Sequence, residues 1–469
     1  MSTSTIGGLR RDLMQLTALA WPILIGQLAV IANGVIDTAM ISRFSATDLA
    51  ALAVGASVYI SVFVGASGVL QALSPIIAQL FGAHDYRAIG VELKQGVWLA
   101  LFLTIAGSFV LLFPQPFLAL AHASPALTEK ATLYLQILAL ALPATLGFKV
   151  YAALNTALAQ PKILMLLQVA ALALKIPLNA LCIFGGFGIP ALGAPGCAIA
   201  TTLLAWLSLI VAFLLLRFSR DYRAFHIFGS GFVAPTWRAQ RALITLGLPM
   251  GLSYLIEVTA FTFMALFIAR MGEVALAGNQ IASNFGAVLY MLPLSIAIAT
   301  GTLVAQAIGA GNMRQARRIG NHGIALAGLV SLSVGLLILL AREQIARAYT
   351  PDLRIIAAAA PLLVFIGVYQ VFDAVQVSAA FILRAYRVAL VPTLIYAVAL
   401  WGVGLGGGYL IGFNIIGNTP PVLRGATGFW FGNSTSIAIV AIGLMWYLRR
   451  IQRRIRSAAG AEVSACSST

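Results

Sequence analysis

The sequence predicts an all-α integral membrane protein, with twelve transmembrane helices in two pseudo-symmetric six-helix bundles around a central cavity. Three observations lead to this fold class. Hydrophobic residues make up 61% of the 469-residue chain and charged residues only 9%, whereas soluble proteins average about 25% charged residues. The apolar residues gather in twelve segments. The second half of the chain repeats the pattern of the first.

Each apolar segment is long enough to span a bilayer, which takes about 20 residues of helix. The segments cover approximately residues 14–42, 48–81, 92–113, 128–158, 163–187, 194–217, 241–270, 275–308, 318–341, 353–384, 388–412 and 424–448. Several are longer than a straight crossing requires, and they therefore predict tilted or kinked helices.

The two halves of the chain are related by an offset of 227 residues: Pro22 matches Pro249, and Arg43 matches Arg270. Because each half holds an even number of helices, both halves start on the same side, as parallel repeats do. Two such bundles facing each other suit alternating access. We expect a tail at 1–13, an amino lobe at 14–217, a linker at 218–240, a carboxy lobe at 241–448 and a basic tail at 449–469.

Lysine and arginine are distributed unevenly between the two sides of the predicted helices. With the amino terminus inside, 20 of the 29 basic residues fall on the inner side and 7 on the outer side, while Lys149 and Lys175 lie within segments. Basic loops favour the cytoplasmic face, so both termini are predicted there. Contact of these loops with anionic lipids explains the net charge of +16 without a nucleic-acid partner.

Three of the 13 acidic residues lie deep within segments: Asp37, Glu257 and Asp373. A charged side chain at membrane depth is costly and by default indicates a functional site. At the 227-residue offset, Glu257 stands where Val30 stands in the first half, and Val30 precedes Asp37 by about two helical turns. Asp37 and Glu257 are therefore expected on equivalent faces of equivalent helices, each directed toward the interior of its lobe.

Polar residues accompany the acids of the second half. Tyr369 comes one helical turn before Asp373, while Gln280 and Asn284 share the i, i+4 spacing, with Tyr290 farther along. Carboxylates with amides and phenols can replace the hydration shell of a small cation such as Na⁺. They can also hold and release a proton, because burial and mutual repulsion favour the neutral form. The alternative is a structural, hydrogen-bonded acid.

Two further residue types bear on the predicted site: the lysines within the segments, and the cysteines and histidines that could bind a metal. Lys149 or Lys175 could pair with Asp37, and Lys149 could instead extend toward the inner face. The three cysteines have no C-x-x-C spacing, and the four histidines do not pair at i, i+4. No disulfide framework, zinc enzyme or cofactor is therefore predicted.

Several stretches jointly resemble the multidrug and toxic compound extrusion (MATE) family, on its NorM-like branch. They are AWPILIGQL, VIDTAMISR, PLNALCIFGGFGIPALGAPGCAIAT, YLIEVTAF, NQIASNF, VFDAVQVSAAFILRAYR and GATGFWFG. The resemblance covers essentially residues 10 to 450. The chain departs from the family pattern at Lys175, where a neutral residue is expected, so that a cation lies in the lobe of Asp37.

The resemblance implies a multi-pass antiporter of the bacterial inner membrane, not an enzyme, that exports organic cations and drugs in exchange for Na⁺ or H⁺. The family's carboxylates on the first, seventh and tenth helices match Asp37, Glu257 and Asp373. Its tyrosine before the tenth-helix acid matches Tyr369. Glu257 and Asp373 would hold the coupling ion, and we expect a monomer. Candidate substrate or supporting residues are Asn179, which matches the asparagine of the family's PLN stretch, Gln280, Asn284, Tyr290 and Lys175.

Two other functions share parts of this pattern. A flippase for a lipid-linked precursor could have the same two-bundle architecture, but it would favour a strongly cationic cavity to hold a pyrophosphate. An intramembrane aspartyl protease would need a G-x-G-D stretch, which this sequence lacks. The repeat also places Asp37 and Asp373 in different lobes.

Overall fold

The computed structural model describes residues 3–120, 125–186, 188, 190–229, 231 and 233–466, and within these ranges the chain is helical with short connections and no β-strand. Twelve of the helical segments are long and apolar enough to cross a membrane. Each of them overlaps one of the twelve predicted segments, so the predicted fold class is confirmed.

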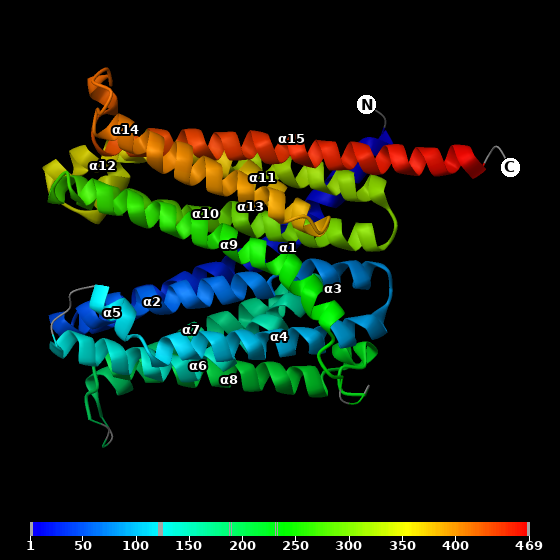
Figure 1. Cartoon of the computed structure of the whole chain (residues 1–469), viewed down its shortest axis with the longest axis horizontal. Helices are drawn as coiled ribbons and strands as arrows, with labels where there is room; N and C mark the ends of the chain where they lie inside the picture. The colour runs from blue at the N-terminus through cyan, green and yellow to red at the C-terminus, as the bar shows by residue number, and fades with distance from the viewer. Residues whose placement is uncertain are drawn as a thin grey trace. The chain divides into compact units, whose positions relative to one another are not determined.

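The first half of the chain contains α1 (Thr3–Ile41), α2 (Ala46–Leu70), α3 (Leu73–Gly82), α4 (Tyr86–Leu112), α5 (Gln115–Leu120), α6 (Pro125–Ala157), α7 (Pro161–Phe184), α8 (Ala194–Phe218) and the 3₁₀ turn η1 (Arg220–Phe225). The second half contains α9 (Trp237–Ala269), α10 (Glu273–Gly309), α11 (Met313–Tyr349), α12 (Leu353–Ala385), α13 (Leu390–Tyr396), the π-helical η2 (Ala397–Gly407), α14 (Gly408–Gly412), the 3₁₀ turn η3 (Pro421–Leu423) and α15 (Ala426–Cys466) (Figure 1).

The helices form two compact units whose boundaries fall inside helices. One unit comprises Trp21–Leu255, and the other comprises Met1–Ala20 with Ile256–Thr469. Both α1 and α9 are therefore divided between the units, whereas the predicted lobes keep every helix whole. The predicted amino-terminal tail is helical from Thr3, and the predicted carboxy-terminal tail continues α15, with residues 467–469 outside the described part of the chain.

A buried carboxylate ties three helices together in the unit of Trp21–Leu255. Asp48, only 1% exposed, accepts hydrogen bonds from Lys130 Nζ at 2.6 Å and from the backbone N–H of Ala194 at 3.0 Å. Ser45 caps the start of α2 beside it. Gly193 has φ of +61°, and a Cβ at this position would overlap the Asp48 carboxylate. Glycine is therefore required where α8 meets α2 and α6.

The linker before α9 is fixed to α4 through side chains that bond its backbone. Gln95, which is 1% exposed, donates from Nε2 to the carbonyl of Ala234 at 2.9 Å and accepts from the N–H of Thr236 at 3.0 Å. Trp98 Nε1 donates to the carbonyl of Val233 at 3.0 Å. These bonds satisfy backbone groups that an irregular segment would otherwise leave unpaired.

In the other unit, α12 lies between α10, α11 and α15 and contacts all three (Figure 1). Its close approach to α11 depends on small residues, because a Cβ on Gly335 would overlap the carbonyl of Gly367. The core that covers α12 from the side of α15 includes Phe429 and Trp430, which are 0% and 2% exposed. This central position explains why a polar residue on α12 can be removed from both lipid and water.

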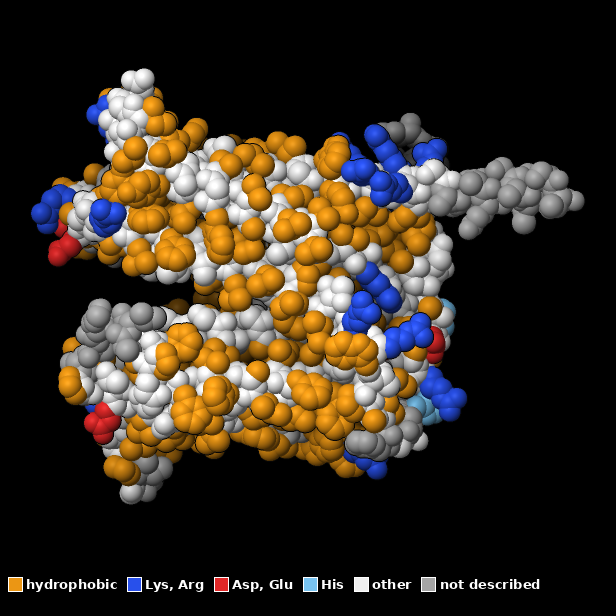
Figure 2. All heavy atoms as spheres, in the orientation of Figure 1, with side chains coloured by type: hydrophobic (Ala, Val, Ile, Leu, Met, Phe, Trp, Pro, Cys, Tyr) orange, Lys and Arg blue, Asp and Glu red, His pale blue; other side chains and the backbone are white. Residues whose placement is uncertain are grey.

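The surface of each unit is apolar along the helices and charged at the helix ends (Figure 2). Large side chains such as Leu340 and Val398 are 80% and 71% exposed. A protein in water rarely shows extended apolar surface, whereas a surface of this kind is what the hydrocarbon core of a bilayer requires. The chain is therefore a multi-pass membrane protein.

Candidate functional site

Asp37 on α1 is held by two side chains from one face of α7. Lys175 Nζ donates to Asp37 Oδ2 at 2.9 Å, and Asn179 Nδ2 donates to Asp37 Oδ1 at 2.7 Å. The i, i+4 spacing of Lys175 and Asn179 places both side chains on that face. Lys175 Nζ also donates to Thr201 Oγ1 on α8 at 2.8 Å. The sequence-predicted residues Asp37, Lys175 and Asn179 thus form one cluster.

The cluster is largely shielded, and its charges are matched. Lys175 is 3% exposed and Asn179 is 0% exposed, while the Asp37 side chain retains 15% exposure. A buried ammonium group is tolerated when it is paired and hydrogen-bonded. Asn179 Oδ1 is buried without a hydrogen-bond partner. The lysine therefore occupies the position in which a small cation would neutralise Asp37.

Lys149 has a different environment. Its Nζ lies 5.5 Å from the centre of the Phe63 ring, a distance that allows a cation–π interaction. Of the two lysines that the sequence offers as partners of Asp37, the structure pairs Lys175 with it.

Asp373 on α12 is the most deeply buried of the three acids, with 1% exposure. Its Oδ1 accepts from Gln376 Nε2 at 2.8 Å, whereas its Oδ2 is buried without a hydrogen-bond partner. Gln376 in turn accepts from the hydroxyl of Tyr396. Tyr396 directly precedes the π-helical η2. Such π-helical stretches are rare in proteins, and those that occur are often found at functional sites.

Sequence reasoning missed Gln376 and Tyr396. Gln376 could have been predicted, because it follows Asp373 by three residues and therefore lies on the same face of the helix. Tyr396 is brought to the site by tertiary packing alone, since it comes from the next span.

Glu257 on α9 is half-buried. The contact between the rings of Phe261, one turn after Glu257, and Tyr369, one turn before Asp373, brings the two acids to the same region. Two carboxylates from different helices, with one oxygen of Asp373 left unpaired, therefore share one region of this unit. Such a pair favours the uptake of a cation or a proton, because two close negative charges repel each other.

Two aromatic rings lie one helical turn away from these acids, Phe261 on α9 and Tyr369 on α12, and a third ring, that of Trp430 on α15, packs against both. The Tyr369 ring centre is 6.4 Å from that of Phe261 and 6.4 Å from that of Trp430, and Phe261 and Trp430 are 6.3 Å apart. Trp430 Nε1 donates to Asn279 Oδ1 at 2.9 Å. Phe261 follows the acid of α9, while Tyr369 precedes the acid of α12. Because these spans run in opposite directions, both rings lie on the same side of the carboxylates.

The predicted residues on α10 are arranged differently from the acids. Gln280 Nε2 donates to Asn284 Oδ1 at 3.1 Å, and both residues are exposed. Tyr290 packs against the small apolar cluster of Leu294 and Val377. The buried amide of this stretch is Asn279, with 1% exposure. The sequence analysis selected the adjacent residue, Gln280, instead.

No group of three or more His, Cys, Asp or Glu side chains that could hold a metal ion occurs in the part of the chain that the structure describes. A sodium ion at Glu257 and Asp373 would therefore need further oxygens from amides, phenols or the backbone. Sodium would be cargo of the transport cycle rather than a resident cofactor.

Comparisons with known proteins agree on one family. A family model described as MatE matches residues 22–181 and 249–410. The chain is 40% identical over 438 residues to the "Probable multidrug resistance protein NorM" of Aromatoleum aromaticum, which covers 93% of each chain. It is 37% identical over 448 residues to the "Multidrug resistance protein PmpM" of Pseudomonas aeruginosa, covering 95% of this chain and 93% of the relative.

Solved structures support the fold. A eukaryotic MATE transporter superposes with a TM-score of 0.83 at 20% identity, covering 96% of this chain and 99% of the other. An outward-facing multidrug resistance transporter of the MATE family superposes with a TM-score of 0.84 at 21% identity, covering 94% and 96%.

Proposed function

This chain belongs to the MATE family, and from that premise we propose that it is a secondary antiporter that exports organic cations and other drugs in exchange for Na⁺ or H⁺. Its relatives are named multidrug resistance proteins, which supports export of drugs as the general activity. The MATE family consists of transporters rather than enzymes. We place the protein in the bacterial cytoplasmic membrane as a monomer, with both termini inside.

The observation that carries the coupling proposal is the unpaired oxygen of Asp373. A buried polar atom without a partner costs free energy, and in this protein it is a carboxylate oxygen in the same region as the second acid, Glu257. Binding a proton or a sodium ion would relieve this penalty and the repulsion between the two acids at once. We therefore assign ion coupling to Glu257 and Asp373, with Tyr369 beside them.

The transport cycle follows from the ion's preference for one arrangement of the protein. An ion can drive exchange only if its affinity differs between the two access states. Opening the acids to water on one side and closing them on the other would supply that difference, since burial penalises their charged forms. Tyr369 and Trp430 are 8% and 2% exposed, so in this proposal the opening of the site brings their ring faces, with that of Phe261, within reach of an organic cation.

In this proposal Asp37 has a supporting part. Lys175 already neutralises it, so we propose that the amino-half cluster acts as an internal ion pair in place of a second external ion. Asn179 and Thr201 keep that pair aligned through hydrogen bonds.

The test is transport by the purified protein in lipid vesicles. A fluorescent organic cation is loaded, and its movement is followed under an imposed Na⁺ gradient, an imposed pH gradient and no gradient. Acceleration by one gradient alone identifies the coupling ion. A parallel arm with a labelled lipid-linked sugar tests the flippase function, and movement of the sugar but not of the dye would overturn the proposal.

A further inference from the structure

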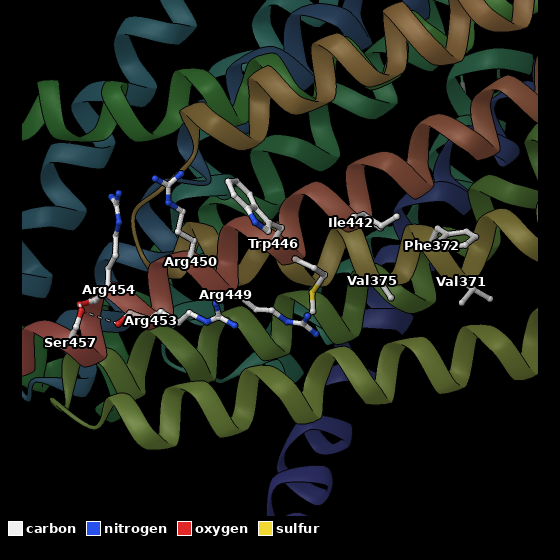
Figure 3. Close-up of a pocket in the computed structure, with 12 residues that line it drawn as sticks. Val371, Phe372, Val375, Ile442, Trp446, Arg449, Arg450, Arg453, Arg454 and Ser457 are labelled. Atoms are coloured by element: carbon white, nitrogen blue, oxygen red, sulfur yellow. Dashed lines mark hydrogen bonds between the residues drawn. The ribbon is translucent and has the colours of Figure 1, made fainter. Parts of the chain in front are cut away.

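A groove of about 960 Å³ lies between α12 and α15 in the unit of the second half. One part of its wall is apolar, with Phe372 and Val375 from α12 and Ile442 and Trp446 from α15. Figure 3 shows these side chains toward one end and the arginines of α15 toward the other. The groove is thus amphiphilic along its length.

The basic part of the groove is dense in charge. It is formed by Arg449, Arg450, Arg453 and Arg454, all exposed and all within two turns of α15. In the described part of the chain, none of the four takes part in a salt bridge. Arg450 lies 5.4 Å from the centre of the Trp446 ring. Four uncompensated guanidinium groups favour an anionic occupant.

A second pocket, of about 460 Å³, lies between α11 and α15 and shares Arg449 and Arg453 with the first. It adds Arg317 from α11 and Gln452 from α15. The two pockets meet at Arg449 and Arg453.

The length of the groove corresponds to one leaflet of a bilayer. Ile442 and Arg454 are twelve residues apart on α15, which is about 18 Å along a helix. Half of a bilayer's hydrocarbon core is about 15 Å thick. An occupant that reaches from the apolar end to the arginines would therefore extend from near the middle of the membrane to the level of the headgroups.

We propose that this groove is a binding site for an anionic glycerophospholipid of the leaflet that faces the cytoplasm. Its acyl chain would lie along Phe372, Val375 and Trp446, and its phosphate would accept hydrogen bonds from Arg449 and Arg453. Arginine suits phosphate because its planar group donates two parallel hydrogen bonds. Basic pockets between transmembrane helices on the cytoplasmic side bind such headgroups. Organic cations, the proposed export substrates, would be repelled from it.

Lipid retention tests the site directly and does not depend on transport. The purified, delipidated full-length protein is mixed with phosphatidylglycerol, cardiolipin or phosphatidylcholine, and bound lipid is counted by native mass spectrometry. Arg449→Gln with Arg453→Gln should lower retention of both anionic lipids at least tenfold. The matched control, Arg456→Gln with Arg220→Gln, removes the same charge from exposed positions outside both pockets and should retain them normally.

A second pair of variants tests the apolar part. Trp446→Ala should weaken retention several-fold without a change in charge, whereas Trp401→Ala, another exposed tryptophan outside the groove, should not. Inorganic phosphate at millimolar concentration should fail to displace the lipid. The proposal would be overturned if phosphatidylcholine were retained as well as the anionic lipids, or if the two arginine double variants retained lipid equally. It would also be overturned if Trp446→Ala left retention unchanged, or if inorganic phosphate displaced the lipid. Thermal unfolding without lipid confirms that every variant is folded.

Discussion

Lys175 Nζ lies 2.9 Å from Asp37 Oδ2, so the acid of the first half of the chain carries its own cation. The second half has no such arrangement at Asp373, whose Oδ2 is buried without a hydrogen-bond partner. Each half of the chain thus holds deep acids, but that of the first half is already paired with a cation, whereas one oxygen of Asp373 in the second half has no hydrogen-bond partner. This asymmetry gives each half a different expected response to mutation.

Lys175→Asn should destabilise the protein by about 3 kcal/mol, because breaking a buried ion pair leaves its partner charge uncompensated. It should also change the ion dependence of transport, since a small cation or a proton could then enter beside Asp37. The measurements are thermal unfolding in detergent and dye transport at varied Na⁺ and pH.

The double variant Lys175→Asn with Asp37→Asn is the control for this prediction. Removing both charges should recover most of the lost stability, because replacing a buried pair by neutral groups is often nearly neutral. Unchanged stability and unchanged ion dependence in the single variant would mean that the ion pair contributes neither to the stability of the protein nor to the ion dependence of transport.

Glu257→Gln and Asp373→Asn should each abolish gradient-driven export while leaving folding and insertion intact. Removing a buried charge carries no burial penalty, so the protein should express normally. The double variant should be little worse than either single one, as is usual for groups that act as a unit. Dye export from vesicles is measured beside Glu343→Gln, whose side chain is 58% exposed and which should export normally. A Glu257→Gln protein that still exports against a gradient would refute the assignment.

The twelve spans and the three deep acids were predictable because long apolar runs and their interruptions are local properties of the sequence. The division of α1 and α9 between two units was not, because it depends on tertiary packing. The same reason applies to Tyr396, which reaches Gln376 from the next span. The α10 helix shows a third case. Asn279 and Gln280 are adjacent amides, and only the rotation of the helix in the bundle decides that Asn279 is buried.

Tyr396→Phe should weaken ion coupling without abolishing it. The variant removes the hydroxyl that donates to Gln376, and Gln376 would then be free to turn away from Asp373. A single hydrogen bond is worth about 1 kcal/mol net, which corresponds to a change of about fivefold in the ion concentration for half-maximal export. Tyr349→Phe, at an exposed helix end, serves as the control. Equal ion dependence in both variants would exclude Gln376 as a positioning residue for Asp373.

Gly193→Ala should destabilise the unit of Trp21–Leu255. The residue has φ of +61°, a conformation that costs a residue with a side chain about 1–3 kcal/mol. Its added Cβ would also overlap Asp48, whose carboxylate holds Lys130 and the start of α8. Both effects act together at this position.

Gly417→Ala separates the two contributions. Gly417 also has positive φ, at +84°, but a Cβ there meets nothing within 4 Å. Backbone strain alone should therefore make Gly417→Ala the milder variant, and thermal unfolding in detergent should rank wild type above Gly417→Ala and Gly417→Ala above Gly193→Ala. If the two variants unfold at the same temperature, the carboxylate of Asp48 moves without cost, and the tie between α2, α6 and α8 contributes little to stability.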